Sequence, residues 1–384
     1  MKITNLKYLL IFLLFCCSQL YAISFQEYKK QQQLGYNKYK TNLENEFKAY
    51  KKAYADAFRD FKKDLKLHWK NPKITTKYTF VEYSKDLKDR KIVDYKNQNI
   101  TFEVIANNQK EAQKRFSKMF NNLMKEDVEQ AYSKDIIEQK VKKKLHKSKL
   151  NHISNQKIIA DMIEEQEKRK LKRQITPSNF KVIKYNKNNI YKITMQLPPK
   201  SFLKKAKIYH KRVKLNAREQ KIPTELIYAI IHSESSFNPM ARSYVPAFGL
   251  MQIVPKTAGR DTYKYLYNKD KLLTSNYLYN SKNNIKIGSG YLHILYYRYL
   301  KNIKNPTSRL YCTIAAYNTG AGNVARVFIG NTNIYKASKV INNLTSNEVY
   351  NKLLRDLPHN ETKHYLKKVY KRVVMYDRLL KNNF

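Results

Sequence analysis

The chain has 384 residues, which is enough for two domains that each bury a sizeable core. Its 76 Lys and Arg residues outnumber its 30 Asp and Glu residues, and the formal net charge at pH 7 is +46. This excess favours an anionic partner such as a nucleic acid, a membrane surface or an acidic polymer, although a general bias in composition would produce it too. With only three cysteines, we expect neither a disulfide framework nor a cysteine-rich zinc site.

The first 22 residues have the pattern of a secretory signal peptide. Lys2 and Lys7 are followed by an apolar run, residues 8–17, which is shorter than the roughly 20 residues that span a bilayer. Ala22 is a small residue at a suitable cleavage point. We therefore expect an exported protein of the periplasm that begins at Ile23, and export makes nucleic acid a poor partner.

The two N-terminal cysteines leave a second kind of export open. Lipidation at Cys16 or Cys17 would attach the protein to the outer membrane, but a lipoprotein signal needs a small residue before the cysteine, and Phe15 precedes Cys16. Cleavage after Ala22 would leave Cys312 as the only thiol. Its apolar, helical surroundings predict a core residue.

The segment 23–70 is predicted to form one long amphipathic helix. Its apolar residues recur from Tyr36 to Leu65 with a mean spacing near 3.6, and the opposite face is rich in lysine. A helix that packs on its own protein and one that binds a membrane both fit, and we favour the first. Pro72 is expected to end it.

Residues 71–199 are predicted to form a small α+β domain. Apolar and polar residues alternate at 76–83, 100–104 and 191–197, which is typical of half-buried antiparallel strands. A charged, largely helical stretch, 109–171, lies between them. No residue cluster here suggests chemistry, so a binding or positioning module is the default expectation.

Residues 200–384 are predicted to form an all-α domain, which makes the chain as a whole α+β. Seven of the eight glycines fall in this part, where turns or close approach of the backbone require them. Helical periodicity predicts helices at 202–220, 223–235, 284–300, 308–317 and 361–380.

The helix after Pro223 carries the first candidate for chemistry, Glu234. Four apolar residues share one face of this helix: Leu226, Ile227, Ile230 and Ile231. Glu234 follows on the same face, so its carboxyl is expected to be buried. Burial raises the pKa of a carboxyl, as a general acid near neutral pH requires. From position alone, a structural carboxylate that is neutralised by a core arginine or caps a neighbouring helix explains the pattern as well.

Three runs in a fixed order connect this residue to a known family. They are Glu-Ser-Ser-Phe-Asn-Pro at 234–239, Gly-Leu-Met-Gln-Ile at 249–253 and Ala-Tyr-Asn-Thr-Gly-Ala-Gly at 316–322. Together they resemble the signature runs of lytic murein transglycosylases with a goose-type-lysozyme-like catalytic domain. Residues 305–309, 326–328 and 347–350 resemble the membrane-bound lytic murein transglycosylase C group in particular. The resemblance covers residues 202–377 well, and the preceding α+β region less strongly.

The resemblance implies roles for individual residues. Glu234 matches the catalytic acid that protonates the oxygen between N-acetylmuramic acid and N-acetylglucosamine, and Tyr317 matches the tyrosine beside it. The implied substrate-binding residues are Ser235, Ser243, Gly249, Met251, Gln252, Asn318 and Tyr365. Among these, Ser243 matches a position near the sugar acetamido group, and Tyr365 belongs to a motif that helps close the cleft. Thr319 departs from the glycine that is common after the Tyr-Asn pair.

A single carboxylate also selects the reaction. Hydrolytic glycosidases usually need two carboxylates. Between Thr224 and Glu348, the acidic residues after Glu225 are Glu234, Asp261 and Asp270, and both aspartates fall in a Lys/Tyr-rich stretch expected to be an exposed loop. A lone acid suits an attack by the C6 hydroxyl of muramic acid, which gives a 1,6-anhydro product without water.

Two other functions stay open at this point. A goose-type lysozyme would use the same fold for hydrolysis, and a non-catalytic wall-binding protein would keep the fold alone. The eight histidines show no paired ligand spacing, so we expect no metal and no cofactor. The expected partners are the glycan strands of peptidoglycan, and we expect a monomer.

Overall fold

The computed structural model describes residues 25–145, 153–199 and 201–382. The predicted signal peptide, with Cys16 and Cys17, lies outside these residues. The described residues from Lys51 onward form one compact unit, and those before it belong to a separate one. The architecture below is that of the unit from Lys51 onward, which contains the sheet and all helices after α2.

The predicted long helix is present as α2, Phe25–Lys66. It ends six residues before Pro72, where the backbone N–H of Trp69 donates to the Leu65 carbonyl at 2.9 Å. Within the compact unit, Tyr54, Phe58 and Leu65 of α2 are buried. The second half of the helix therefore packs on its own protein, as the apolar periodicity indicated.

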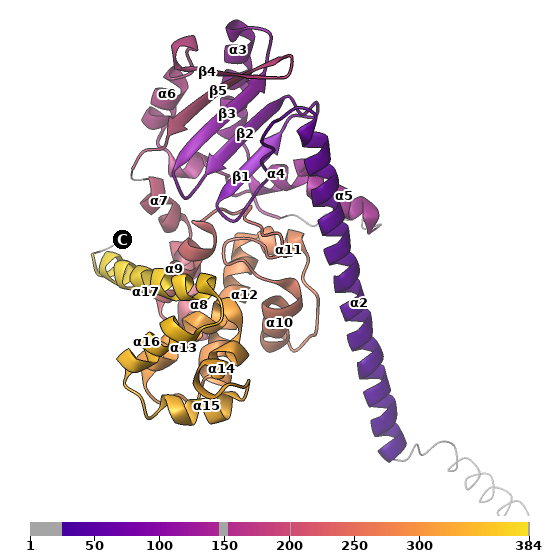
Figure 1. The fold of residues 1–384 in the computed structure, drawn as a ribbon, viewed down its shortest axis with the longest axis vertical. Helices are drawn as coiled ribbons and strands as arrows, with labels where there is room; N and C mark the ends of the chain where they lie inside the picture. The colour runs from indigo at the N-terminus through magenta and orange to yellow at the C-terminus, as the bar shows by residue number, and fades with distance from the viewer. Residues whose placement is uncertain (1–24, 146–152, 200, 383–384) are drawn as a thin grey trace, which may run out of the picture. The chain divides into compact units, whose positions relative to one another are not determined.

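A five-stranded antiparallel sheet follows, in the order β1-β2-β3-β5-β4 (Figure 1). The strands are β1 Thr79–Tyr83, β2 Asp89–Asp94, β3 Asn99–Ile105, β4 Lys181–Tyr185 and β5 Asn188–Gln196. The three predicted antiparallel strands are confirmed, whereas β2 and β4 were not predicted. The expectation of half-buried strands is wrong for β3, where every residue after the first is buried, because the sheet is covered on both faces.

Helices and side chains from outside the sheet cover these two faces. The helices between β3 and β4 are α3 Gln109–Leu123, α4 Val128–Lys134, α5 Ile136–Lys144 and α6 Glu165–Arg173, with short turns η1 Ala160–Met162 and η2 Pro177–Asn179. On one face, the ring of Phe102 stacks on Phe116 of α3 at 6.4 Å. On the other, the guanidinium of Arg90 lies 4.2 Å from the ring centre of Trp69. The predicted helical stretch between the strands is confirmed.

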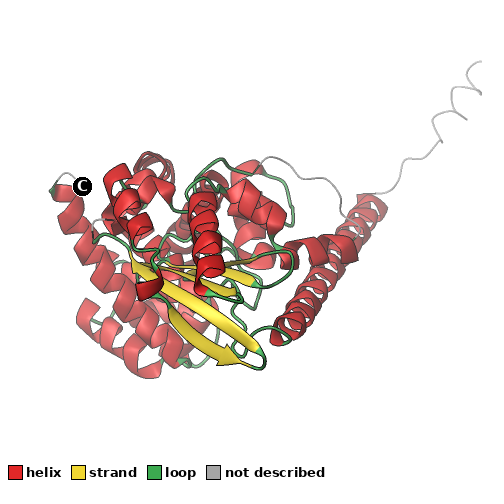
Figure 2. Ribbon diagram, turned by 90° about the horizontal axis from the view of Figure 1, so that it is seen from above, coloured by secondary structure: helices red, strands yellow, loops and turns green. Residues whose placement is uncertain are grey.

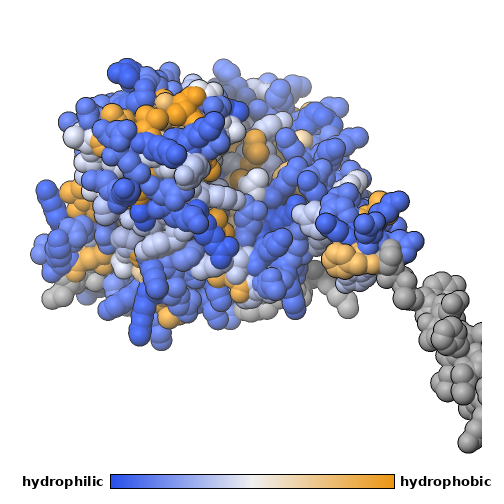
Figure 3. Space-filling model, turned by 90° about the horizontal axis from the view of Figure 1, so that it is seen from below, coloured by the Kyte–Doolittle hydropathy of each residue, from blue (hydrophilic) through white to orange (hydrophobic). Residues whose placement is uncertain are grey.

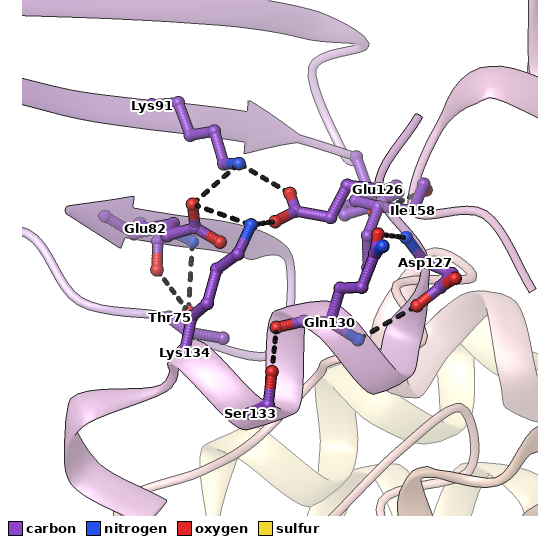
Figure 4. A network of polar contacts seen from close by, with 11 residues as sticks. Thr75, Glu82, Lys91, Glu126, Asp127, Gln130, Ser133, Lys134 and Ile158 are labelled. Atoms are coloured by element: carbon purple, nitrogen blue, oxygen red, sulfur yellow. Dashed lines mark hydrogen bonds and ion pairs between the residues drawn. The ribbon is translucent and has the colours of Figure 1, made fainter. Parts of the chain in front are cut away.

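A charged network joins the sheet to α4 (Figure 4). The Lys91 ammonium lies 2.8 Å from Glu82 and 2.5 Å from Glu126, and Lys134 lies 2.7 Å from the other Glu126 oxygen. Burial raises the pKa of Glu82 to about 7, and Lys91 opposes this shift. A buried charge needs a partner, and here Lys91 and Lys134 both pair with the buried carboxylate of Glu126.

The rest of the compact unit is helical, and the described residues from 201 onward form no strand, only isolated bridges (Figures 1 and 2). Its elements are α7 Ser201–Ile208, α8 His210–Gln220, α9 Thr224–Ser235, η3 Pro255–Gly259, α10 Arg260–Tyr267, α11 Ser275–Tyr279, α12 Ser281–His293, η4 Ile294–Tyr299, α13 Pro306–Thr319, α14 Ala321–Ile329, α15 Ile334–Ile341, α16 Ser346–Asp356 and α17 Asn360–Lys381. The α+β fold class is confirmed.

The predicted helices are present with changed boundaries. The stretch 202–220 divides into α7 and α8 at Tyr209, and the last turns of the 284–300 helix are wider π-type turns, η4. Helices α10, α11 and α14 to α16 were not predicted. Helix α17 packs along α9, and Cys312 of α13 is fully buried, as predicted.

The surface agrees with the basic composition. The face in Figure 3 is mostly hydrophilic, and its hydrophobic residues lie in separate patches. Among the described residues, no helix combines the length and the apolar character that crossing a membrane requires.

Candidate active site

Glu234 lies in the last turn of α9, with its side chain buried. It is 5% exposed, on the helix whose apolar residues are fully buried, so the predicted orientation is confirmed. The two residues that follow the helix, Ser236 and Phe237, have φ values of 49° and 65°. Left-handed conformations of non-glycine residues cost energy and often occur at functional sites. Here they turn the chain away directly after the carboxyl.

Burial raises the pKa of Glu234 above its ordinary value. Three groups oppose this shift: the Lys77 ammonium, whose Nζ lies 3.7 Å from Oε2, the Tyr365 hydroxyl and Lys368, while Glu361 reinforces it. The Tyr365 hydroxyl is close enough to lower the pKa of Glu234, although its geometry does not meet the criteria for a hydrogen bond. The net result is a carboxyl that keeps its proton to a higher pH, as a proton donor must.

The carboxyl end of α9 is surrounded by cationic side chains. Lys368 donates to the Ser233 carbonyl at 3.2 Å, and Arg372 donates to the Ser233 hydroxyl at 2.9 Å. Burial lowers the pKa of Lys368 to about 8, with Arg372 acting in the same direction. Cations are favourable at a helix C-terminus, where carbonyl groups lack partners. The alternative that a core arginine neutralises Glu234 is not what the structure shows, because its ion-pair partner is Lys77.

The run at 249–253 forms a tight turn that Asn284 holds in place. Gly249 has a φ of 74° and Gln252 a φ of 48°. A Cβ at Gly249 would lie 2.3 Å from the Asn284 amide, so only glycine fits here. The Asn284 side chain accepts from the Met251 N–H and donates to the Phe248 carbonyl, both at 2.8 Å. Asn284 was not predicted, and its spacing from the turn gives no local signal.

The predicted tyrosine lies at the junction of this turn and Glu234. The Tyr317 hydroxyl donates to the Met251 carbonyl at 2.9 Å, and its ring packs edge-on against Tyr291 at 5.6 Å. Burial raises the pKa of Tyr317, and the charge of Glu234 adds to this shift. Asn318 accepts a 2.8 Å hydrogen bond from Thr362 of α17. A hydrogen bond therefore joins the second and third sequence runs, and the charge of Glu234 in the first run reaches Tyr317.

The other predicted binding residues differ in how accessible their side chains are. Ser235 is fully buried, and its hydroxyl donates to the Ile231 carbonyl at 3.0 Å. Met251 is fully buried too, whereas Gln252 is 8% exposed and donates to the Gly249 carbonyl at 3.0 Å. Ser243 is half-buried and donates to the Val245 carbonyl.

The two aspartates do not lie in one exposed loop, which corrects the sequence-based expectation. Asp261 belongs to α10, and Asp270 is held by Arg260 through two 2.6 Å hydrogen bonds. The carboxylate with the largest effect on the pKa of Glu234 is instead Glu361 of α17. The sequence-based count of carboxylates ended at Glu348 and therefore omitted Glu361.

The α+β region also contributes to the site, which corrects the expectation that it holds no chemically relevant residues. Lys77, in the loop before β1, reaches Glu234. The same loop borders a pocket of about 660 Å³, whose lining includes Lys77, Ser243 and Tyr244. A pocket of this size is in the range that holds small ligands. No cluster of His, Cys, Asp or Glu suited to a metal ion occurs among the residues that the structure describes.

Comparisons with known proteins place this site in a family context. Residues 212–340, which include Glu234 and Tyr317, match the family model described as "Transglycosylase SLT domain". Over 180 residues, the chain is 42% identical to proteins named membrane-bound lytic murein transglycosylase C from Yersinia enterocolitica and Serratia proteamaculans. These alignments cover 47% of this chain and 49% of each relative, so the match spans about half the length of the relatives.

Among solved structures, the 70 kDa soluble lytic transglycosylase of Escherichia coli aligns with a TM-score of 0.34 and 16% identity. The alignment covers 71% of this chain and 44% of that one.

Proposed function

We propose that this protein is a peptidoglycan lytic transglycosylase that cleaves the β-1,4 bond between N-acetylmuramic acid and N-acetylglucosamine without water. The observation that carries the proposal is the buried carboxyl of Glu234, whose raised pKa suits proton donation. The SLT-domain match and the names of the 42% identical relatives support the same reaction.

In the first step, the Glu234 carboxyl donates its proton to the bridging oxygen as the bond from that oxygen to C1 of muramic acid breaks. The bonding electron pair leaves with the oxygen, which becomes the 4-hydroxyl of N-acetylglucosamine. The sugar left behind has oxocarbenium character, and Glu234 is now a carboxylate.

In the second step, the same carboxylate acts as the base. It takes the proton of the C6 hydroxyl of muramic acid while that oxygen forms a bond to C1. The product is a 1,6-anhydro sugar, and Glu234 returns to its neutral form. One residue thus serves as acid and then as base.

The other site residues are assigned supporting roles in this proposal. Tyr317, Asn318 and Tyr365 bound the space beside Glu234, and Gln252 and Ser243 present polar groups to the sugars. The side chains of Ser235 and Met251, together with Gly249, shape the wall from within, since the first two are fully buried.

The proposal extends to organisation and location. We infer a signal peptide at 1–22, a helix at 23–70, an α+β domain at 71–199 and a catalytic domain at 200–384. We place the protein in the cell envelope, as a monomer in the periplasm that acts on glycan strands. Lipidation at Cys16 or Cys17 would attach it to the outer membrane, in line with the relatives being named membrane-bound.

The test replaces carboxyls one at a time and follows the release of soluble fragments from purified murein. Glu234→Gln keeps the size of the side chain but removes the transferable proton, so turnover should fall by roughly 10² to 10⁴. Asp261→Asn, Asp270→Asn and Glu361→Gln should each keep most of the activity. Because the charge of Glu361 reaches Glu234, an inactive but folded Glu361→Gln variant would instead favour a two-carboxylate hydrolase.

A further inference from the structure

The loop before β1 is fastened to the end of α9 by several independent hydrogen bonds. The Tyr78 hydroxyl donates to the Ser233 carbonyl at 2.9 Å. The Asn238 amide donates to the carbonyls of Thr76 and Lys77, both at 3.3 Å. These contacts join residues that are far apart in the sequence, and they hold the backbone of Lys77 next to the turn that follows Glu234.

This anchoring leaves the Lys77 side chain directed at the catalytic carboxyl. Its Nζ lies 3.7 Å from Oε2 of Glu234, and the exposed fractions of the two side chains are 31% and 6%. Lys368, the other nearby lysine, is held differently, because its Nζ donates to the Ser233 carbonyl and to the Tyr78 hydroxyl. Lys77 is thus the cation that forms an ion pair with Glu234.

We propose that Lys77 is a positioning residue that stabilises the carboxylate form of Glu234, so that the α+β region completes the active site. The inference rests on the proposed function in one respect, namely that Glu234 must exist as a carboxylate between the two steps. A buried carboxylate without a cation would be costly to form. Lys77 reduces that cost when the proton leaves, and its partial exposure keeps the ammonium itself solvated.

The sign of the change in the Glu234 pKa follows from the groups with the largest effect on this carboxyl. Burial and Glu361 raise the pKa of Glu234, whereas Lys77, Tyr365 and Lys368 lower it. Tyr78 and Tyr317 also lie within electrostatic range of Glu234. Burial raises the pKa of each hydroxyl most, and the charge of Glu234 adds to this shift. Lys77 is the cation that opposes the effect of burial most strongly, so removing its charge raises the pKa of Glu234 further.

The experiment compares Lys77→Met, which keeps most of the apolar stem, with Lys77→Arg, which keeps the charge. Infrared difference spectra of the full chain against its Glu234→Gln counterpart isolate the neutral Glu234 carboxyl band and report its titration without any turnover. In Lys77→Met the band should persist to higher pH than in the wild type, and in Lys77→Arg it should not. Lys85→Met removes an exposed lysine after β1 and serves as the charge control, with unchanged titration expected.

A kinetic measurement provides the second readout. In Lys77→Met the alkaline limb of kcat/KM on murein should move to higher pH, and the plateau should fall by about threefold to tenfold because a weaker acid donates more slowly. Lys77→Arg should restore both. If Lys77→Met lowers Tm, Lys77→Gln carries the same comparison.

The outcomes separate this inference from the proposed function. Titration of the Glu234 band at the same pH in the wild type and Lys77→Met would overturn the role of Lys77, whatever the activity. A shifted band in a protein that releases nothing from murein would support the role of Lys77 and contradict the proposed reaction.

Discussion

Gly288→Ala is expected to disturb the site from inside the protein. Gly288 lies in α12, and a Cβ added there would stand 2.3 Å from Sδ, 2.7 Å from Cε and 2.9 Å from Cβ of Met251. Ordinary contacts of a Cβ begin near 3.4 Å. Met251 is fully buried and its carbonyl accepts the Tyr317 hydrogen bond, so a displaced Met251 also displaces the tyrosine beside Glu234.

Two opposing effects set the change in the free energy of unfolding that we expect for Gly288→Ala. Inserting a methyl group into a packed core costs about 1 to 3 kcal/mol, and alanine gains about 1 kcal/mol over glycine within a helix. Because Met251 has no exposed surface into which it can move, we expect the upper part of the first range. The net loss in the free energy of unfolding should be about 1 to 2 kcal/mol, with murein cleavage slowed by roughly tenfold.

Urea denaturation and the release of soluble fragments from murein measure these two effects. Gly35→Ala in α2 is the matched control, because a Cβ there meets nothing within 4 Å and should not destabilise. Met251→Ala removes the clashing Sδ and Cε, so Gly288→Ala should cost less in that background than alone. The predicted clash between a Cβ at position 288 and Met251 would be refuted if the losses in the free energy of unfolding of the two single variants simply added up in the double variant. A Gly288→Ala protein as stable and active as the wild type would refute it too.

Three further variants test the surrounding structure. Burial raises the pKa of Glu138 to about 7, so ionisation of this carboxyl destabilises the folded state as pH rises from 4.5 through 7. Glu138→Gln should therefore raise the free energy of unfolding by about 2 kcal/mol more at pH 8 than at pH 5. An equal effect at both pH values would disprove this. Lys91→Met removes a cation from the buried Glu126 carboxylate and the half-buried Glu82 carboxylate, and it should lower the free energy of unfolding by about 3 kcal/mol. An unchanged free energy of unfolding in urea denaturation would contradict this. Tyr317→Phe removes the hydrogen bond to the Met251 carbonyl and should slow turnover with little change in Tm, whereas unchanged turnover would leave the hydroxyl without a role.

The helical parts of the fold were predictable because their signals are local. The spacing of apolar residues located α2 and α9, and the same spacing placed Glu234 on the buried face. The failures have equally specific causes. Strand β2 buries Arg90 and Lys91, whose partners Glu103 and Glu126 lie elsewhere in the chain, so its sequence shows no apolar alternation.

The candidate site was predictable only where motif residues carry it. Glu234 and Tyr317 come from such runs, and the structure brings them into electrostatic range. Lys77 and Asn284 carry no local signal, because each matters only through residues brought near by the tertiary fold. In a chain with 76 basic residues, one functional lysine cannot be distinguished by composition.

The masses of the products of murein digestion test the proposed reaction most directly. The wild type should release fragments that are lighter than hydrolytic muropeptides by one water and that lack a reducing end, because the C6 oxygen takes the place of water. Glu234→Gln should release almost none. Fragments with predominantly reducing ends would show that water attacks C1, and would contradict a transglycosylase that works with Glu234 alone.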